Sequence, residues 1–370
     1  MSSRAIVEGI PVPLANPDSQ YRLVPGQHPL APGDKTGPPT SRFRLRVAAE
    51  VWRALQYIGI CVHFLAAPRP PSPSFTRIVP SVIAKEVGHF GISVYTPEGY
   101  AGARSARRGR GFPVVVNFHG GGFTLGSGTD DARFGRFVLE RCGAVFVSVD
   151  YRLAPEYPFP TAVDDGADAL LYLILNAAEL HIDPHRIATS GFSAGGNLAI
   201  TTPLRLHSFL AENKAPTPEH RVVAVASWYP ITDYTITRAS RRARAKRPDR
   251  ALPPILTDLF DASYIHPAGL DLANPHLSPA QATDELLVAG LPGDIIMYTC
   301  EWDMLLHEGE EFAGRLAGAG VGKRVSYRMM KEVSHGWDKG PYPFSPAAGS
   351  EEAYAECCDH LRRVFEGGLV

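Results

Sequence analysis

A serine lies between two glycines in the segment Gly191-Phe192-Ser193-Ala194-Gly195, which fits the pattern G-x-S-x-G. An apolar, strand-like run at 186–190 precedes this segment, and a helix-like run, GNLAITTPLRL, follows it. Such a strand-to-helix turn is sharp and strained at the serine, and small neighbours leave it room. The start of the following helix also favours developing negative charge. We therefore predict that Ser193 is a nucleophile.

Three consecutive glycines follow another apolar run, PVVVNF at 113–118, in the motif HGGGF at 119–123. Glycines without side chains allow successive backbone N–H groups to point into one cavity. We expect the N–H groups of Gly121, Gly122 and Ala194 to form an oxyanion hole, which stabilises the negative charge of a tetrahedral intermediate. Together with Ser193, these donors predict nucleophilic chemistry at an acyl carbonyl.

The elements that must position these residues alternate along the chain. Short apolar, β-branched runs predict strands at 92–95, 113–118, 144–149, 186–190, 222–228, 294–299 and 324–329. Helical patterns lie between them at 131–141, 162–179, 195–210 and 308–319. This alternation predicts the α/β class, with a parallel sheet that has helices on both faces.

The N-terminal part of the chain has a different character. Residues 1–40 contain eight prolines, which predicts an extended arm. Residues 41–66 then predict an amphipathic helix with Ser41 as its N-cap. Its apolar side chains recur at steps of four and three, at Val51, Leu55, Ile58, Val62 and Leu65. We expect this face to pack on the body of the protein; a position in a membrane interface or over a substrate pocket is the alternative.

Charge and composition limit the classes of partner. The chain has 370 residues, of which 45% are hydrophobic, and its 37 basic and 38 acidic residues give a net charge of −1. No overall field would attract nucleic acid, so we expect no nucleic-acid partner. The segment 238–250 carries seven basic residues and one acid. We interpret it as a solvated surface rather than a nucleic-acid patch.

The same sequence predicts a cytoplasmic protein. The first twenty residues lack the apolar core of a secretory signal. The longest apolar stretch, 54–68, is shorter than the roughly 20 residues that a membrane span needs. Five widely spaced cysteines without a CxxC motif predict free thiols in a reducing compartment. The sequence leaves open whether the protein forms a homodimer.

Motifs for metals and cofactors are absent from the sequence. His181 and His185 are four residues apart, but Pro184 breaks the helix that would align them. No HExxH or Cys/His zinc spacing occurs, and no GxGxxG follows a strand-like run. We therefore expect neither a metal nor a cofactor.

Over roughly residues 85–340 the chain resembles the hormone-sensitive-lipase-like branch of the α/β-hydrolases. The matching motifs occur in order as HGGGF at 119–123, VDYRLAPEYPFPTAVDD at 149–165, GFSAGGN at 191–197, YPITD at 229–233, EWDMLLHEG at 301–309 and SHGWD at 334–338. The resemblance implies an α/β-hydrolase fold with about eight mostly parallel strands, helices on both faces and a helical cap. We expect an arm and cap helix at 1–75, and a catalytic domain at 76–370 with a cap insertion around 235–285.

The resemblance also supplies the partners of the serine. In this fold the chain order is serine, acid, histidine. Asp303 matches the position of the acid, with Glu301 as the fallback, and His335 matches the position of the histidine in preference to His307. Glu156 and Asp233 match positions that organise loops near the site.

One position departs from the branch, because Phe192 stands where an Asp usually precedes the serine. We expect this change to affect loop geometry and the shape of the pocket more than the mechanism.

The expected activity is hydrolysis of carboxylic esters with small or medium acyl chains, through an acyl-enzyme, on a small-molecule substrate. Acyl transfer, or hydrolysis of a lactone or thioester of a specialised metabolite, is the alternative within enzymes. A non-catalytic small-molecule receptor on the same fold is the alternative of another class. Receptors of this kind in the family lack the histidine of the triad, whereas His335 is present here.

Overall fold

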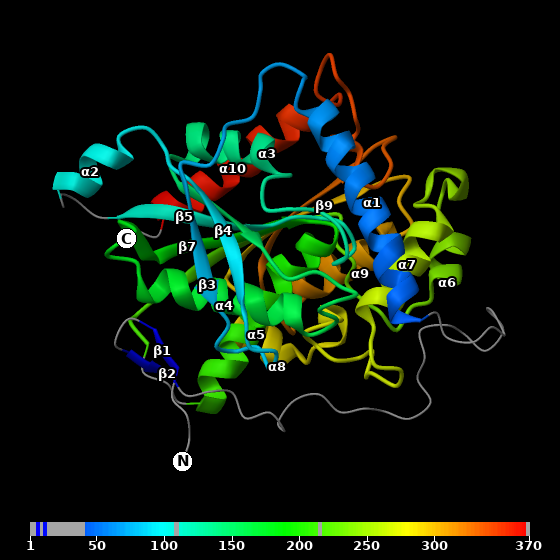
Figure 1. The fold of residues 1–370 in the computed structure, drawn as a ribbon, viewed down its shortest axis with the longest axis horizontal. Helices are drawn as coiled ribbons and strands as arrows, with labels where there is room; N and C mark the ends of the chain where they lie inside the picture. Colours follow the sequence, from blue (N-terminus) through cyan, green and yellow to red (C-terminus); the bar gives the residue numbers. More distant parts are fainter. Residues whose placement is uncertain (1–4, 8–9, 13–40, 107–110, 214–216, 368–370) are drawn as a thin grey trace.

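The computed structural model describes residues 5–7, 10–12, 41–106, 111–213 and 217–367 (Figure 1). Its main sheet has the order β10-β9-β8-β7-β5-β6-β4-β3, in which β4 alone runs opposite to the others. The strands are β3 (Phe75–Pro80), β4 (His89–Tyr95), β5 (Phe112–Phe118), β6 (Val145–Asp150), β7 (Ile182–Phe192), β8 (Val222–Trp228), β9 (Asp294–Cys300) and β10 (Arg324–Met330). The prediction of about eight mostly parallel strands is confirmed.

Helices cover both faces of this sheet (Figure 1). On one side lie α4 (Thr161–Leu175) and α5 (Ala194–Asn213); on the other lie α3 (Ala132–Phe137) and α10 (Ser350–Gly367). The side chains of β5 alternate between the two cores, because Val114 and Val116 belong to one apolar cluster and Val115 to the other. All three valines are completely buried, as expected for a strand covered on both faces.

The predicted helices occur at nearly the expected positions. The segment 162–179 forms α4, 195–210 lies within α5, and 308–319 corresponds to α9 (Leu306–Ala317). The segment 131–141 forms α3 followed by a π-helical turn, Val138–Cys142. Within the predicted cap insertion around 235–285 lie α6 (Arg238–Arg244) and α7 (Pro254–Tyr264). The helices α2 (Tyr100–Ala106), α8 (Asp284–Gly290) and α10 have no predicted counterpart of their own.

The predicted N-terminal helix is α1 (Arg42–His63), and the Ser41 hydroxyl accepts a hydrogen bond from the Arg44 N–H at 3.3 Å. Its predicted packing face was wrong. Val51, Leu55 and Ile58 are each more than half exposed, and the buried side lies opposite. Periodicity showed that an apolar face exists, but it does not show which neighbour covers that face.

Arginine side chains hold α1 to the body. Arg53 donates to Glu156 at 3.0 Å and to the Thr124 carbonyl at 2.9 Å, and Arg46 donates to Glu156 at 2.7 Å. Arg42 reaches the Ser263 carbonyl at the end of α7. The inner side of α1 is therefore attached through these polar contacts as well as through the buried Leu45 and Ala49.

The basic segment 238–250 lies largely at the surface, as expected, but one of its arginines is buried. It forms α6 and a short turn, and Arg241 is buried against Glu308 with an N–O distance of 2.5 Å. Further pairs join its cations to acids, at Arg238–Asp261, Arg244–Glu311 and Lys246–Glu301. Acidic neighbours thus neutralise much of the charge that the sequence alone presents.

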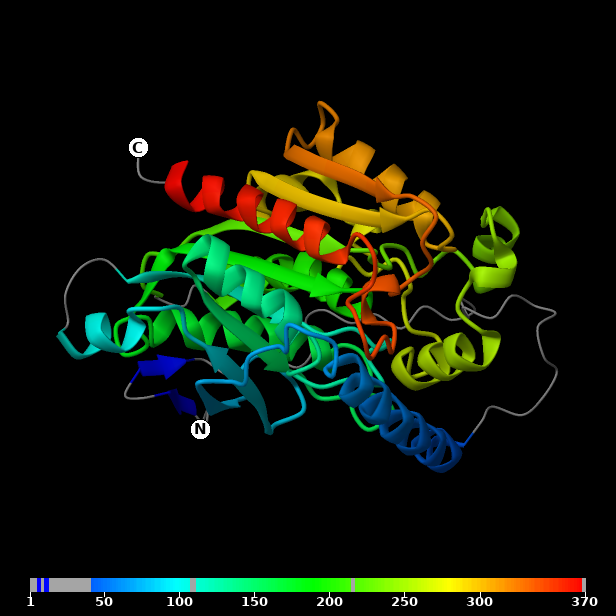
Figure 2. The same cartoon turned by 90° about the horizontal axis from the view of Figure 1, so that it is seen from above.

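The helices α1, α6 and α7 gather at one end of the molecule, beyond the arrowheads of the parallel strands (Figure 2). This is the end at which parallel α/β sheets place their functional loops. Residues 5–7 and 10–12 form a separate antiparallel ladder of β1 (Ala5–Val7) and β2 (Ile10–Val12); the rest of the predicted arm lies outside the described residues. Within the described part of the chain, no helix combines the length and the hydropathy needed to cross a bilayer.

Candidate active site

The G-x-S-x-G segment forms the turn between β7 and α5. Ser193 has a left-handed backbone with φ of 57°, and its N–H donates to the Trp228 carbonyl at 2.8 Å. Close backbone approach requires a glycine after it: a Cβ built on Gly195 would lie 1.9 Å from the Phe118 carbonyl oxygen. The strained serine is therefore held by neighbouring strands and presented at the start of α5.

The structure brings the three predicted side chains together from three loops. His335 Nε2 lies 2.7 Å from Ser193 Oγ, and His335 Nδ1 lies 2.5 Å from Asp303 Oδ2. The Asp303 carboxylate is fully buried, and its other oxygen accepts the Leu305 N–H at 3.0 Å. The histidine can thus accept a proton from the serine while the carboxylate fixes its tautomer and orientation.

Glu301 and His307, the alternatives to Asp303 and His335, have other hydrogen-bond partners. Glu301 accepts from Lys246 at 2.9 Å and from the Glu332 N–H at 2.9 Å, and these bonds lower its pKa. His307 Nε2 lies 3.0 Å from the Arg244 carbonyl oxygen. Neither side chain contacts the serine–histidine pair, so the geometry favours Asp303.

The HGGG loop lies directly beside the serine. A Cβ built on Gly120 would be 3.6 Å from the Ser193 Cβ, and Gly121 and Gly122 line the same cavity as Ser193 and His335. Ala194 is buried as the first residue of α5. Gly121 and Gly122 thus line the cavity that contains Ser193, and Ala194 follows the serine directly.

Gly122 also meets the cap. Its φ is 59°, and a Cβ built on it would lie 2.2 Å from the ring of Phe260 in α7. Only glycine combines this conformation with this contact. The HGGG loop at 119–122 and α7 therefore pack against each other, with no side chain from Gly122 between them.

The cavity above Ser193 encloses about 190 Å³. Its apolar wall consists of Ile60 of α1 and Leu252, Leu256 and Phe260 of the segment around α7. Its polar wall consists of Gln56, Asp130, Asp131 and Lys339. Gln56 donates to Asp130 at 3.0 Å, and burial raises the pKa of the Asp130 carboxyl. The volume lies below the usual range of ligand pockets and suits a small substrate.

Phe192 occupies a site built from aromatic rings and one cation. Its ring stacks on Trp228 with centroids 5.3 Å apart, and Lys339 Nζ lies 3.7 Å from its centroid. Lys339 also pairs with Asp131 at 2.8 Å and Asp338 at 3.3 Å. Burial lowers the pKa of Lys339, but Asp131, Tyr354 and Asp338 together raise it well above its usual value. The ammonium group therefore stays charged beside the ring of Phe192.

The two loop residues singled out by the resemblance have structural partners. Glu156 receives hydrogen bonds from Arg46 and Arg53 of α1; burial raises its pKa, but these bonds and one from the backbone lower it overall. Asp233 accepts from Thr235 and from Gln281 at 2.7 Å. Glu156 thus anchors the roof of the cavity, and Asp233 closes a loop near the cap.

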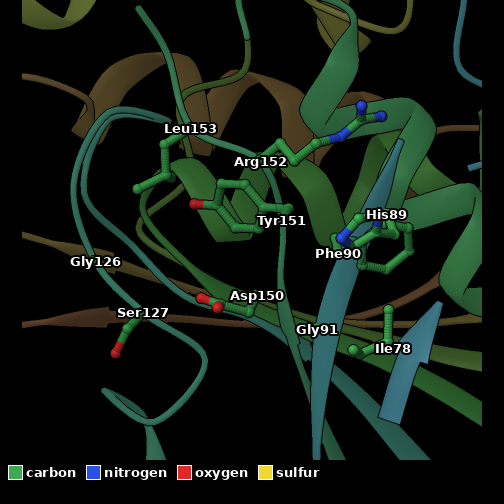
Figure 3. Close-up of a pocket in the computed structure, with 10 residues that line it drawn as sticks. All are labelled: Ile78, His89, Phe90, Gly91, Gly126, Ser127, Asp150, Tyr151, Arg152 and Leu153. Carbon is green, nitrogen blue, oxygen red and sulfur yellow. The ribbon is translucent and has the colours of Figure 1, made fainter. Parts of the chain in front are cut away.

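A second cavity, of about 470 Å³, lies away from the serine at the edge of β4 and β6 (Figure 3). His89, Asp150 and Arg152 project around it, and the Arg152 guanidinium is held by Asp165 at 2.7 Å. Ser127 and His89 both line this cavity, but the Ser127 hydroxyl donates to Asp130 at 2.7 Å. Among the described residues, no cluster of three or more His, Cys, Asp and Glu side chains is arranged to hold a metal ion.

Sequence reasoning missed Gln56, Asp130, Asp131 and Lys339 as residues of the cavity. Gln56 could have been found only from the orientation of α1, which the apolar pattern predicted wrongly. Asp131 and Lys339 stand more than 200 positions apart in the sequence, and no local pattern joins them. Lys339 does follow the SHGWD motif directly, and that adjacency was the available signal.

Comparison with known proteins identifies one fold family and several similar esterases. Residues 115–339 match a family described as having the alpha/beta hydrolase fold. An arylesterase of Saccharolobus solfataricus is 38% identical over 60% of this chain and 67% of its own length. Carboxylesterase NlhH of Mycobacterium tuberculosis is 37% identical over 58% of this chain and 63% of its own length.

A solved structure is similar over more of the chain. The hyperthermophilic esterase of Pyrobaculum calidifontis aligns with a TM-score of 0.68 and 28% identity, and the alignment covers 88% of this chain and 92% of that one. The two curated relatives are thus matched over about two thirds of their length, whereas this structural match extends over nearly all of the esterase.

Proposed function

Because the chain belongs to the α/β-hydrolase fold family, we propose that it hydrolyses carboxylic esters by nucleophilic catalysis at Ser193. The single observation that carries this proposal is the continuous contact from Asp303 through His335 to the serine hydroxyl, at 2.5 Å and 2.7 Å. The similar proteins are named as esterases, which supports an ester substrate and favours hydrolysis over the acyltransferase and receptor alternatives.

The proposed reaction has two halves. Ser193 Oγ attacks the acyl carbonyl while His335 Nε2 takes its proton, and Asp303 stabilises the imidazolium that forms. The N–H groups of Gly121, Gly122 and Ala194 receive the oxyanion. His335 then gives its proton to the leaving alcohol, and water, with His335 as the base, releases the acid from the acyl-enzyme.

The small cavity sets the proposed substrate range. A volume of about 190 Å³, closed on one side by Leu252, Leu256 and Phe260, accommodates a short or medium acyl chain. We place the enzyme in the cytoplasm and propose a small-molecule ester, not a nucleic acid, as its partner. Whether the enzyme acts as a homodimer is a separate question, which size-exclusion chromatography with light scattering decides.

The test is a panel of p-nitrophenyl esters of increasing acyl length, measured with the full chain and with Ser193→Ala. We expect short esters to be the best substrates and the alanine variant to lose at least about 10³-fold in kcat. Labelling by a fluorophosphonate probe should occur in the parent enzyme alone. Undiminished turnover by Ser193→Ala would show that another residue is the nucleophile.

A competition experiment addresses acyl transfer. Incubation with an ester donor and a second alcohol separates transesterification from hydrolysis by the ratio of the products. We expect the free acid to be the main product. Predominant formation of the new ester would instead identify an acyltransferase that uses the same three residues.

A further inference from the structure

The outer face of α1 is apolar along its whole length. Its exposed large side chains recur at steps of three or four, at Phe43 (75% exposed), Val47 (50%), Val51 (55%), Leu55 (51%) and Ile58 (59%). Leu65 (57%) follows just past the helix end. Tyr57 extends the same side and is 72% exposed. We call these residues the outer α1 face. The helix lies at the edge of the molecule in Figure 2.

This surface is unusual in size for a protein that stays fully surrounded by water. A helix of 22 residues is about 33 Å long, and the apolar side chains follow it from end to end. Soluble monomers rarely expose a contiguous apolar patch larger than a few hundred Å², and larger ones mark surfaces that bind something. The outer α1 face therefore calls for a partner with an apolar surface.

The charges around the face indicate the chemistry of that partner. Arg44 near the start of α1 and Arg69 beyond its end are both exposed. Glu50 is the single acidic residue in Arg42–His63, and Arg53 already binds it at 2.7 Å. An apolar stripe with an arginine at each end matches a phospholipid surface, where acyl chains receive the stripe and phosphates receive the guanidinium groups.

The same charges argue against a second copy of the chain as the occupant. If two α1 helices paired through their outer faces, Arg44 and Arg69 would find no free carboxylate on the facing helix, since Glu50 is bonded to its own Arg53. Desolvated, unpaired arginines would oppose such an association. A headgroup phosphate removes that cost because it accepts hydrogen bonds from each guanidinium.

The opposite side of α1 roofs the active-site cavity. Gln56 and Ile60 line this cavity together with Ser193, while Leu55 and Ile58 point outward. Apolar residues of two neighbouring segments are also exposed: Ile255 of α7, which packs on α1, and Phe344, in the loop that begins where Gly340 bonds to His63 at 3.0 Å. Exposed apolar residues thus also occur on segments next to α1.

We propose that α1 is a peripheral lipid-docking helix, which lies in the headgroup region of a phospholipid surface containing anionic lipid. It lies on that surface and does not cross it. A consequence, which rests on the proposed function, is that the enzyme takes apolar esters that dissolve in the lipid and reach the cavity under α1.

The test is flotation of the full chain with phosphatidylcholine vesicles and with vesicles that also contain phosphatidylserine. All variants carry Ser193→Ala, so that binding is measured without hydrolysis and independently of the proposed function. We expect the chain to float with mixed vesicles and Val51→Ser/Leu55→Ser/Ile58→Ser to lose at least about tenfold in partition coefficient. Arg44→Gln/Arg69→Gln should lose the preference for anionic vesicles.

A matched control uses exposed apolar residues of other elements, Ile78 in β3 and Val288 in α8, which are 72% and 48% exposed. Ile78→Ser/Val288→Ser should float like the parent chain. In the active background, the triple serine variant should hydrolyse a soluble p-nitrophenyl ester at the parental rate, because none of its three positions lines the cavity.

Three outcomes would overturn the proposal. The first is that the parent chain does not float with either vesicle. The second is flotation that the triple serine change leaves unaltered. The third is a parental dimer in light scattering that this change converts to monomers without any vesicle binding, which would assign the outer α1 face to a second copy.

Discussion

The ammonium nitrogen of Lys339 lies 3.7 Å from the centre of the ring of Phe192, the residue immediately before Ser193. The same ammonium group pairs with Asp131 and Asp338, so it joins the histidine loop, the serine turn and the start of α3. Phe192 therefore contacts a cation at a position where the hormone-sensitive-lipase-like branch usually has an acid.

Removal of this cation should destabilise the protein. Lys339→Met leaves two buried carboxylates without their charge partner, which predicts a loss of about 3–5 kcal/mol in the free energy of unfolding. Phe192→Leu removes only the ring face and should cost about 1–2 kcal/mol beyond packing losses. Urea denaturation measures both, and the exposed Lys331→Met serves as the control. Equal effects of Lys339→Met and Lys331→Met would contradict a role for the buried pairs.

The acid of the triad can be distinguished from its neighbour by two isosteric changes. Asp303→Asn no longer stabilises the imidazolium of His335 and should lower kcat by about 10⁴-fold with little change in KM. Glu301→Gln loses surface bonds to Lys246 and Glu332 and should retain nearly parental kcat. Steady-state kinetics on a short p-nitrophenyl ester decides between them. The reverse pattern would assign the acid role to Glu301.

Addition of one methyl group at Gly122 should displace the backbone of the HGGG loop at 119–122. Gly122→Ala places a Cβ against the Phe260 ring and should lower kcat by at least about 10²-fold, because the loop must move away from the oxyanion. Gly99→Ala is the matched control, since Gly99 also has positive φ but nothing lies within 4 Å of its added Cβ. It should cost about 1–2 kcal/mol in stability with kcat unchanged. Similar kcat in the two variants would refute the proposed contact.

Buried His276 predicts a pH effect on stability. Burial, with a smaller contribution from Arg205, lowers the pKa of its imidazole to about 3. Between pH 6.5 and 3 the unfolded chain therefore binds the proton that the folded chain excludes, so stability falls as the pH falls. The loss approaches about 1.4 kcal/mol for each pH unit inside this window.

The measurement is the free energy of unfolding at pH 7 and pH 5 for the parent chain and His276→Gln. The parent should lose more stability over this interval than the variant, whatever their absolute stabilities. The partly exposed His220→Gln provides the control and should follow the parent. Parallel pH dependence of all three proteins would show that His276 does not exclude a proton on folding.

The strands and the serine turn could be predicted because their signals are local. The run 113–118 is apolar at every buried position of β5 except Asn117, and the G-x-S-x-G pattern encodes the strand-to-helix turn directly. The strand β3 was missed because it is an edge strand: Ile78 is 72% exposed, and a run of prolines precedes the strand. Its pairing with β4 depends on a neighbour that its own sequence does not specify.

The composition of the site was harder to predict. Ser193, Asp303 and His335 each lie in a recognisable motif, whereas Lys339 and Asp131 acquire their relation to Phe192 only when three distant loops meet. The orientation of α1 was predicted wrongly for a similar reason. Its inner side is held by arginine contacts such as Arg53 with Glu156, and an apolar pattern carries no information about them.

These arginine contacts give the enzyme two parts of unequal durability. The sheet and its helices pack through buried valines and aromatic rings. By contrast, Arg46 and Arg53 hold α1 over the cavity through ion pairs with Glu156, and these pairs are partly exposed to solvent. Salt screens such exposed ion pairs, but it does not weaken the packing of a buried apolar core in this way. At molar salt concentrations we therefore expect α1 to be held less firmly over the cavity, while the sheet and its packed helices keep their structure.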